Sequence, residues 1–280
     1  MLEQISSVIK QQQNGSDKNK IAAVELNLAC PNIVGKPTIG YDFEQMEDVL
    51  AQVCSLPCFS GPSAPLFPLG VKLPPYFDRP HFEMAAALLN RYKRVLGYAA
   101  SINTIGNALA VDHRAEMPAV RANGGYAGLS GPAVKYTALA NVRQLRELLD
   151  PSIDVVGVGG VTTGRDAFEM LLCGATAVQV GTCHWIEGPG CFSRIAEELR
   201  QIMKEKGYGR VDDFRGRLKE WSKEGSAASR KARMAEKQAQ AGANDASVKV
   251  EGKTNNQHII AVLLAIIAVL LADKFQIVSL

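Results

Sequence analysis

The chain has 280 residues, of which 47% are hydrophobic and 21% are charged, values typical of a globular protein. This length allows one large domain or two small ones. Residues 1–218 carry 22 basic and 22 acidic side chains, whereas residues 219–280 carry 9 basic and 6 acidic ones. The net charge of +3 therefore lies in the C-terminal part. The body lacks the basic field that nucleic acids require, so we expect no nucleic-acid partner.

The six cysteines are scattered along the chain, and the polar segment Met1–Lys20 has no secretory signal. This pattern favours reduced thiols inside a cell. Cys54 and Cys58 lie four positions apart, but no second Cys/His pair follows at the spacing of a zinc site. We therefore predict no metal site.

Short apolar runs alternate with helix-like stretches after residues 1–20, a polar segment expected to be partly helical. Such alternation is typical of βαβ units that build a parallel sheet. The expected strands are Ala22–Leu28, Pro68–Lys72, Gly97–Asn103, Asp154–Val158 and Ala175–Val180. The expected helices are Phe43–Val53, His81–Arg91, Tyr136–Leu149, Gly164–Leu172 and Cys191–Lys206. Residues 57–68, rich in proline, serine and glycine, are expected to form a surface insertion.

The C-terminal part changes in composition after about residue 219 and lacks the large apolar residues that build a core. Ile259–Ala272 is then an apolar run of 14 residues, shorter than the roughly 20 that usually span a bilayer. It could form a core helix packed on a partner, but the polar linker before it favours a hydrophobic helix that anchors the chain to a membrane. We expect four segments: 1–20, 21–221, 222–257 as linker, and 258–280 as hydrophobic tail.

Polar residues and glycines gather where the expected strands end. In a (β/α)8 barrel the carboxyl ends of the strands hold the active site. The residues at these ends are Asn27, Cys30 and Asn32 for the first strand, Lys72 for the second, Asn103 and Thr104 for the third, Gly159 and Gly160 for the fourth, and Gly181 and Thr182 for the fifth.

Each residue type has a functional and a structural interpretation. The glycine-rich stretch Gly157–Gly164 could bind a phosphate with its backbone and the helix that follows, or form a simple turn. Lys72 could stabilise negative charge on a cofactor ring, or be a partly buried structural cation. Cys30 could be a base or a nucleophile, or a small core residue. The asparagines could bind a planar heterocycle or cap turns.

Several strings together resemble class 1A dihydroorotate dehydrogenases, in matching order and spacing over about Ala22–Trp221. They are E-L-N-L-A-C-P-N (Glu25–Asn32), V-K-L-P-P-Y-F-D (Val71–Asp78), I-N-T-I-G-N (Ile102–Asn107), G-P-A-V-K-Y-T-A-L-A-N (Gly131–Asn141), G-V-G-G-V-T-T-G-R-D-A-F (Gly157–Phe168) and V-Q-V-G-T (Val178–Thr182).

The resemblance implies an enzyme of pyrimidine biosynthesis that oxidises dihydroorotate to orotate on FMN, with fumarate as electron acceptor. It implies that Cys30 is the base that removes the C5 proton and that Lys72 lies beside the isoalloxazine ring. It implies a homodimer with a cytoplasmic catalytic part, which the tail would tether to a membrane. The residues implied to bind orotate are Asn27, Asn32, Asn103 and Thr104. Those implied to bind FMN are Asn27, Lys72, Asn103, Gly131, Gly159, Gly160, Gly181 and Thr182.

The sequence departs from the family pattern at Ala29 and Thr104, where serine is usual, and at Ser130, where glycine is common. It also has no counterpart of the family's first three βα units. We therefore expect an incomplete (β/α)8 barrel of about five βα units that is poorly stable or binds FMN weakly. Alternatives are another FMN-dependent barrel, such as a dihydrouridine synthase, a quinone-linked class 2 enzyme, and a non-catalytic tail-anchored fragment.

Overall fold

The computed structural model describes residues 2–13, 21–30, 37–61, 65–235 and 237–238. The chain divides into two units, Met1–Leu218 and Lys219–Leu280. In the second unit, residues 223–235 are helical. No helix within the described residues is long and apolar enough to cross a bilayer. The apolar run Ile259–Ala272 lies outside the described residues, so the hydrophobic helix and the membrane anchor stay predictions.

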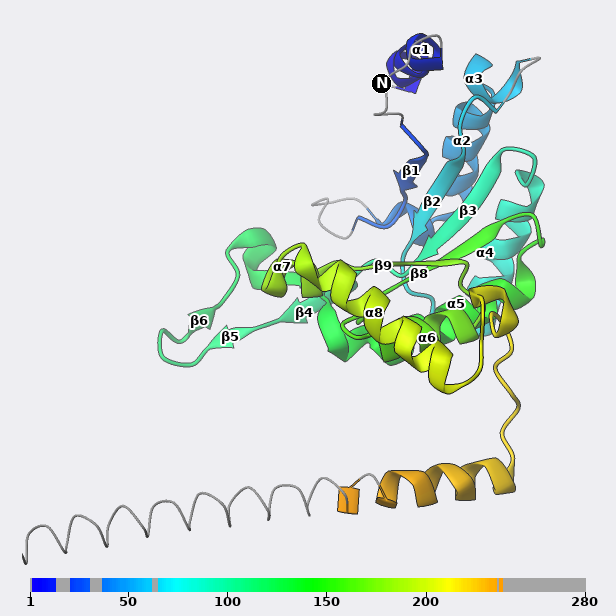
Figure 1. The fold of residues 1–280 in the computed structure, drawn as a ribbon. Helices are drawn as coiled ribbons and strands as arrows, with labels where there is room; N and C mark the ends of the chain where they lie inside the picture. The colour runs from blue at the N-terminus through cyan, green and yellow to red at the C-terminus, as the bar shows by residue number, and fades with distance from the viewer. Residues whose placement is uncertain (1, 14–20, 31–36, 62–64, 236, 239–280) are drawn as a thin grey trace, which may run out of the picture. The chain divides into compact units, whose positions relative to one another are not determined.

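A five-stranded parallel sheet forms the centre of the first unit, in the order β1-β2-β3-β8-β9 (Figure 1). The strands are β1 (Val24–Asn27), β2 (Leu69–Leu73), β3 (Leu96–Ser101), β8 (Asp154–Val158) and β9 (Ala177–Gln179). Each of the five lies where the alternating apolar pattern predicts a strand, and β8 coincides with its predicted range.

The two faces of the sheet differ because side chains alternate along each strand. Leu69 and Val71 of β2, Ala99 of β3 and Val155 of β8 are fully buried on the outer face, where they pack in the main hydrophobic cluster. Side chains such as Lys72 alternate with them and occupy the inner face. The core of the unit therefore lies between the sheet and the helices outside it.

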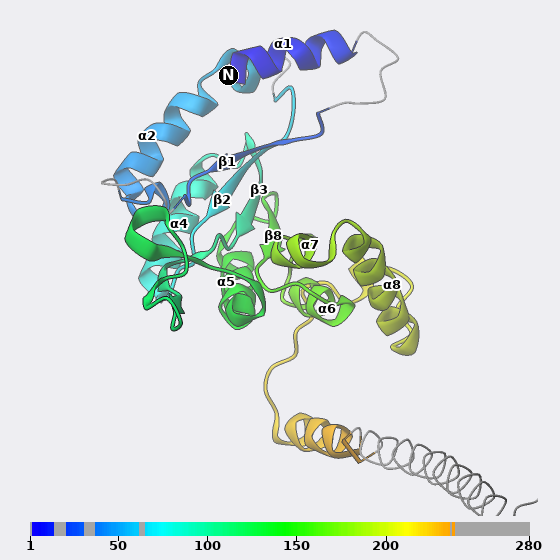
Figure 2. The ribbon, with the colours of Figure 1, turned by 90° about the vertical axis from the view of Figure 1, so that its left-hand side faces the viewer.

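The main helices follow the strands and cover this outer face (Figure 2). Three of them begin at a capping side chain. The carboxylates of Asp42 and Asp78 accept from backbone N–H groups three residues on. Thr163 and Asp166 form a reciprocal capping box. The helices are α2 (Phe43–Cys54), α4 (Arg79–Arg91), α5 (Lys135–Leu148), α6 (Gly164–Leu172) and α8 (Gly190–Glu205).

Smaller elements complete the unit. Helix α1 (Leu2–Gln13) precedes the sheet, and α3 (Pro57–Ser60) and α7 (Thr182–Glu187) are short. The interpretation of residues 57–68 as a surface insertion is wrong in part. Phe59 and Phe67 are buried and pack edge to face with ring centroids 5.0 Å apart. Burial of two aromatic rings stabilises this segment more than its proline and glycine residues destabilise it. Short 3-10 turns are at Ile39–Tyr41, Ala122–Gly125, Gly131–Val134 and Val211–Asp213.

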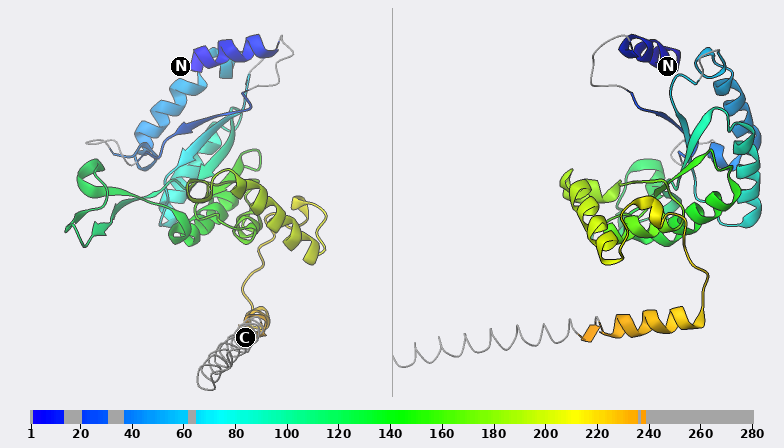
Figure 3. Two further views of the ribbon diagram at one scale, coloured as in Figure 1. Left: turned by 60° about the vertical axis from the view of Figure 1, so that its left-hand side comes forward. Right: turned by 45° about the vertical axis from the view of Figure 1, so that its right-hand side comes forward.

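An antiparallel arm between β3 and α5 extends away from the sheet (Figures 1 and 3). Its base pairs β4 (Ile105–Leu109) with β7 (Tyr126–Leu129), and its tip pairs β5 (Val111–Asp112) with β6 (Met117–Pro118). The sequence analysis did not predict this arm, because its strands are short and lack apolar alternation.

The sheet is strongly curved. Strands β1 and β9 stand at opposite ends of the strand order, yet the side chain of Gln179 donates from Nε2 to Oε2 of Glu25 at 3.0 Å. Five adjacent strands of an eight-stranded barrel span about half its circumference, so the first and last strands face each other across the interior. This contact therefore fits the curvature of the predicted partial barrel.

Candidate functional site

A cavity of about 310 Å³ opens at the carboxyl ends of the parallel strands. This volume lies near the lower end of the range of small-molecule pockets. Eight predicted site residues line it together: seven come from four different strand ends, and Gly131 was implied by the family resemblance. They are Lys72, Asn103, Thr104, Gly131, Gly159, Gly160, Gly181 and Thr182.

Asn27 does not line the cavity but lies beside it. The side chain of Asn103 donates from Nδ2 to the backbone oxygen of Ala29 at 2.8 Å, and the same atom lies 3.5 Å from Oδ1 of Asn27. Asn27 Oδ1 in turn accepts from the backbone N–H of Ala29 at 3.1 Å. Two predicted asparagines thus hold the first residues of the loop that follows β1.

Cys30 comes directly after this anchored backbone and is a free, half-buried thiol. It is not among the residues that line the cavity. Asn32 falls in residues 31–36, which lie outside the described residues. The structure therefore places Cys30 next to a fixed point of the loop, and the role of Asn32 stays a prediction.

Lys72 has an acceptor that the sequence analysis did not single out. Its ammonium donates to Oε1 of Gln179 at 2.8 Å and lies 3.6 Å from Oε1 of Glu25. Gln179 also lines the cavity, as do Ser130 and Trp185. The sequence could have pointed to Gln179, because it is a polar residue in the middle of the apolar run before Gly181. At the same rim, Thr182 Oγ1 donates to Ser130 Oγ at 3.0 Å.

Glycines bring the backbone close to the cavity. Gly131, Gly159 and Gly160 have φ values of 77°, 127° and 72°, a region that residues with a Cβ rarely adopt. A Cβ on Gly160 would lie 3.0 Å from the backbone oxygen of Gly131, so the absence of a side chain at Gly160 allows the two loops to approach this closely. A Cβ on Gly181 would meet nothing within 4 Å.

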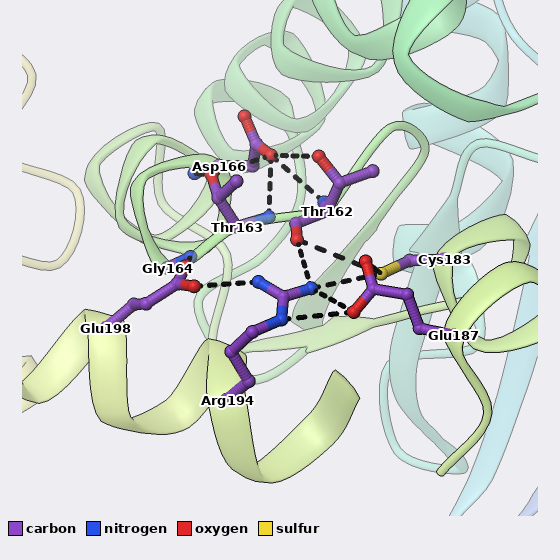
Figure 4. A network of polar contacts seen from close by, with 8 residues as sticks. All are labelled: Thr162, Thr163, Gly164, Asp166, Cys183, Glu187, Arg194 and Glu198. Carbon is purple, nitrogen blue, oxygen red and sulfur yellow. Dashed lines mark hydrogen bonds and ion pairs between the residues drawn. The ribbon is translucent and has the colours of Figure 1, made fainter. Parts of the chain in front are cut away.

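The loop after β8 is held by charged side chains (Figure 4). Arg194 of α8 pairs with Glu187 at 2.6 Å and with Glu198 at 2.7 Å, and its Nη2 donates to the backbone oxygen of Thr162 at 3.0 Å. Glu198 accepts from the backbone N–H of Gly164 at 2.6 Å. Helix α8 is therefore tied directly to the rim of the cavity.

Asp166 closes the same loop from inside. Its carboxylate accepts from the backbone N–H groups of Thr162 and Thr163 at 3.0 and 2.8 Å, and Lys135 pairs with it at 2.8 Å. Glu198 accepts from the backbone N–H of Gly164, the first residue of α6, and Thr163 Oγ1 accepts from that of Asp166. The protein's own side chains therefore cap part of this helix start, and phosphate binding by the glycine-rich stretch stays a prediction.

Cys183 lies under this network and is buried. Burial, followed by the hydrogen bond with Glu187, raises the pKa of its thiol to about 11. This group is protonated at neutral pH, although it lines the cavity. It therefore belongs to the wall of the site and lacks the thiolate that a nucleophile needs.

The sequence model of the family described as dihydroorotate dehydrogenase matches residues 5–203. The chain belongs to the dihydroorotate dehydrogenase family. It is 51% identical over 195 residues to a Streptococcus uberis protein that carries a provisional name as dihydroorotate dehydrogenase A (fumarate), covering 70% of this chain and 59% of that protein. It is 49% identical over 195 residues to the dihydroorotate dehydrogenase A (fumarate) of Lactococcus lactis subsp. cremoris, covering 70% and 60%.

These relatives confirm the resemblance to the fumarate-type, class 1A group of dihydroorotate dehydrogenases. The chain spans about three-fifths of the length of these curated relatives, 59% and 60%. What they catalyse is therefore carried to this chain only as a proposal.

The fold is confirmed independently by solved structures. The ligand-free dihydroorotate dehydrogenase of Eimeria tenella superposes with a TM-score of 0.53 at 20% identity, covering 70% of this chain and 55% of that one. Its complex with ferulenol gives 0.52 at 21% identity, covering 69% and 53%. The five-stranded sheet is thus the part of a dihydroorotate dehydrogenase barrel that the sequence predicts.

Proposed function

We propose that this chain oxidises dihydroorotate to orotate with FMN, as a step of pyrimidine biosynthesis, and that fumarate is the electron acceptor. The observation that carries the proposal is the single cavity at the carboxyl ends of the strands. Eight of the predicted site residues line it, although they are spread from position 72 to position 182 of the chain.

The residues present fit FMN. Gly131, Gly159 and Gly160 line the cavity with positive φ values, a backbone conformation that glycine adopts without strain. Gly181 leaves open space where a Cβ would be, and Thr182 adds a hydroxyl at the same rim. The cation of Lys72 lines the cavity from β2 and would stabilise negative charge on the ring.

The residues that would bind the substrate lie in the loop after β1 and at the end of β3. Asn27 and Asn103 each offer an amide donor and acceptor, and Thr104 adds a hydroxyl, which together suit a cyclic imide and its carboxylate. Asn32 is proposed as a further substrate contact. The anchored backbone at Ala29 fixes the start of the loop from which Cys30 would reach the substrate.

The reaction removes one proton and one hydride from dihydroorotate, leaving the ring double bond of orotate. FMN supplies the hydride acceptor when it is bound. The Cys30 side chain would take the C5 proton as a general base, and the ammonium of Lys72 would stabilise negative charge on the ring. Fumarate would later accept the hydride and a proton, which returns the site to its starting state.

A second candidate is a non-catalytic binding protein. The outer edges of β1 and β9 have no partner strand among the described residues, and such edges readily pair with another chain. This candidate predicts a folded chain that does not retain flavin.

The visible absorption spectrum of the purified full chain, mixed with FMN, desalted and then treated with dihydroorotate without oxygen, tests the proposal. Flavin absorption that stays with the protein and bleaches supports dihydroorotate oxidation. Fumarate should then restore the absorption. If flavin is retained but not bleached, dihydroorotate is not the substrate. If all flavin is lost, the second candidate, a non-catalytic binding protein, is favoured.

A further inference from the structure

Three polar side chains meet inside the curved sheet, each from a different strand. Glu25 comes from β1, Lys72 from β2 and Gln179 from β9. Oε1 of Gln179 accepts from Lys72 at 2.8 Å, and Nε2 of Gln179 donates to Glu25 at 3.0 Å. Lys72 and Gln179 line the cavity, whereas Glu25 is not among its lining residues. Glu25 therefore touches the site only through its two neighbours.

The charges of Glu25 and Lys72 together fix which way the amide of Gln179 points. A carboxylate only accepts hydrogen bonds, so Glu25 requires the NH2 end of the amide. An ammonium only donates, so Lys72 requires the carbonyl end, and the amide joins the two charges in one orientation. The carboxylate also attracts Lys72 directly, at 3.6 Å.

The surroundings of Glu25 hold it in place. Its side chain and that of Lys72 are only 24% and 16% exposed, so solvent screens their attraction weakly. Burial raises the pKa of Tyr98 on β3, and the nearby charge of Glu25 raises it further. The ring of Tyr98 lies over Gly70, where a Cβ would come within 2.1 Å of it. Gly70 thus leaves room for the phenol beside the carboxylate.

We propose that Glu25 is a positioning residue for Lys72, which it aims at the cavity by orienting the amide of Gln179. The inference rests on the proposed function for the purpose of Lys72, but the orientation itself is a property of the chain without cofactor. It predicts that one carboxylate in the cluster is enough to hold Lys72, whether it stands at position 25 or at position 179. The double variant E25Q/Q179E keeps one carboxylate and one amide but places the carboxylate next to Lys72.

The first test uses the full chain without FMN, with lysine labelled by ¹⁵N at Nζ. An ammonium held in a hydrogen bond exchanges its protons slowly enough to give a separate NMR signal, which Lys72→Arg assigns. We expect E25Q to remove or shift this signal and E25Q/Q179E to restore it. Glu147→Gln on α5, an exposed acid paired with Arg143, is the matched control and should leave the signal unchanged. An unchanged signal in E25Q would overturn the inference.

The second test measures the midpoint potential of FMN bound to the full chain. Loss of a negative charge near the flavin would by itself raise the potential. Loss of an aimed Lys72 would lower it, because the ammonium stabilises the reduced form. We expect E25Q to lower the potential and E25Q/Q179E to return it close to that of the unmodified chain. A higher potential in E25Q would overturn the inference.

The two tests separate this inference from the proposed function. If the chain does not retain FMN, the proposed function fails while the lysine signal still decides the role of Glu25. If FMN is retained and reduced by dihydroorotate, but E25Q changes neither the signal nor the potential, the function stands and the positioning role is wrong. E25D serves as a second variant if E25Q does not fold, and it should shift the Lys72 signal because its carboxylate is one methylene shorter.

Discussion

The side chain of Asn141 pairs with both backbone groups of Tyr76. Its Oδ1 accepts from the N–H of Tyr76 at 2.8 Å, and its Nδ2 donates to the carbonyl oxygen of the same residue at 3.0 Å. Asn141 is 1% exposed, so no water can replace these bonds. A side chain from a helix thus provides the hydrogen bonds that the backbone of Tyr76, in the loop after β2, would otherwise form with a neighbouring strand.

Replacing Asn141 by leucine should lower the free energy of unfolding by about 2–4 kcal/mol, because two buried backbone groups lose their partners. Urea denaturation followed by circular dichroism measures the change. Glu147→Gln on the same helix should change the stability by less than about 0.5 kcal/mol. Equal losses of stability in the two variants would contradict a stabilising role of the hydrogen bonds between Asn141 and Tyr76.

Asp166 should make the stability of the fold depend on pH in the acid range. Burial opposes ionisation of its carboxyl, but hydrogen bonds from Lys135, Thr162 and Thr163 outweigh it and lower the pKa to about 2. An unfolded aspartate has a pKa of about 3.9, so the contribution is complete above pH 4 and is lost as the pH falls toward 2. Its size is about 2 kcal/mol.

Denaturation curves between pH 5 and about pH 2 check this dependence. The Asp166→Asn variant should be less stable than the original chain above pH 4, and the difference should shrink as the pH falls. A difference that stays constant over the whole range would show that the carboxylate charge is not what holds the loop.

Cys30 is proposed as the base, so Cys30→Ser should slow flavin reduction by dihydroorotate about 10²–10⁴-fold near neutral pH, with FMN still bound. Stopped-flow absorption measures the rate. Cys54→Ser is the matched control. Burial raises the pKa of the Cys54 thiol to about 11, and the residue lies in α2. Unchanged reduction in Cys30→Ser would remove Cys30 from the mechanism.

Two glycines of the cavity should respond differently to alanine. Gly160→Ala should destabilise the fold by about 1–3 kcal/mol, since it forces a side chain into a positive φ and places its Cβ 2.7 Å from that of Lys135. Gly181→Ala should leave the denaturation midpoint nearly unchanged, because its Cβ meets nothing. If the open space beside it holds FMN, this variant should bind the flavin more weakly in equilibrium dialysis.

The apolar tail gives a separate prediction. Deletion of residues 259–280 should move the chain from the membrane pellet to the supernatant after centrifugation of a cell lysate. A version of the full chain with Leu263 and Ile267 changed to lysine should do the same, because charges at the centre of an apolar helix oppose insertion. Continued pelleting of both would argue against an anchor.

The sequence predicted the parts of the fold whose signals are local. Strand β8 and helix α6 have the predicted bounds, since an apolar run and a helix-like stretch mark them within a few residues. The arm from Ile105 to Leu129 was not predicted, because its pairing depends on contacts between distant short strands. Asn141 was not singled out either, since nothing in its own helix shows that a backbone 65 positions away needs it.

In the candidate site too, residues with a local sequence signal were predicted, and residues that depend on contacts between distant strands were not. Glycines and polar residues at strand ends are visible in the sequence, and seven of them share one cavity. Glu25 and Gln179 were not proposed as site residues, because their partnership depends on the curvature that brings the two ends of the sheet together. A lone acid or amide inside an apolar strand becomes informative only when its partner across the interior is known.

The hydrogen bond from Asn103 to Ala29 links what enters the cavity to the loop that carries Cys30. The amide nitrogen of Asn103 has two hydrogens, and one is engaged with Ala29 while the other points toward Asn27 at the longer distance of 3.5 Å. A ligand that accepts from Asn103 can take the weaker contact and leave the loop anchored. A ligand that needs both hydrogens must release Ala29, and with it the backbone before Cys30. The number of hydrogen bonds that a ligand draws from one amide thus determines whether the carbonyl of Ala29 keeps its bond to Asn103.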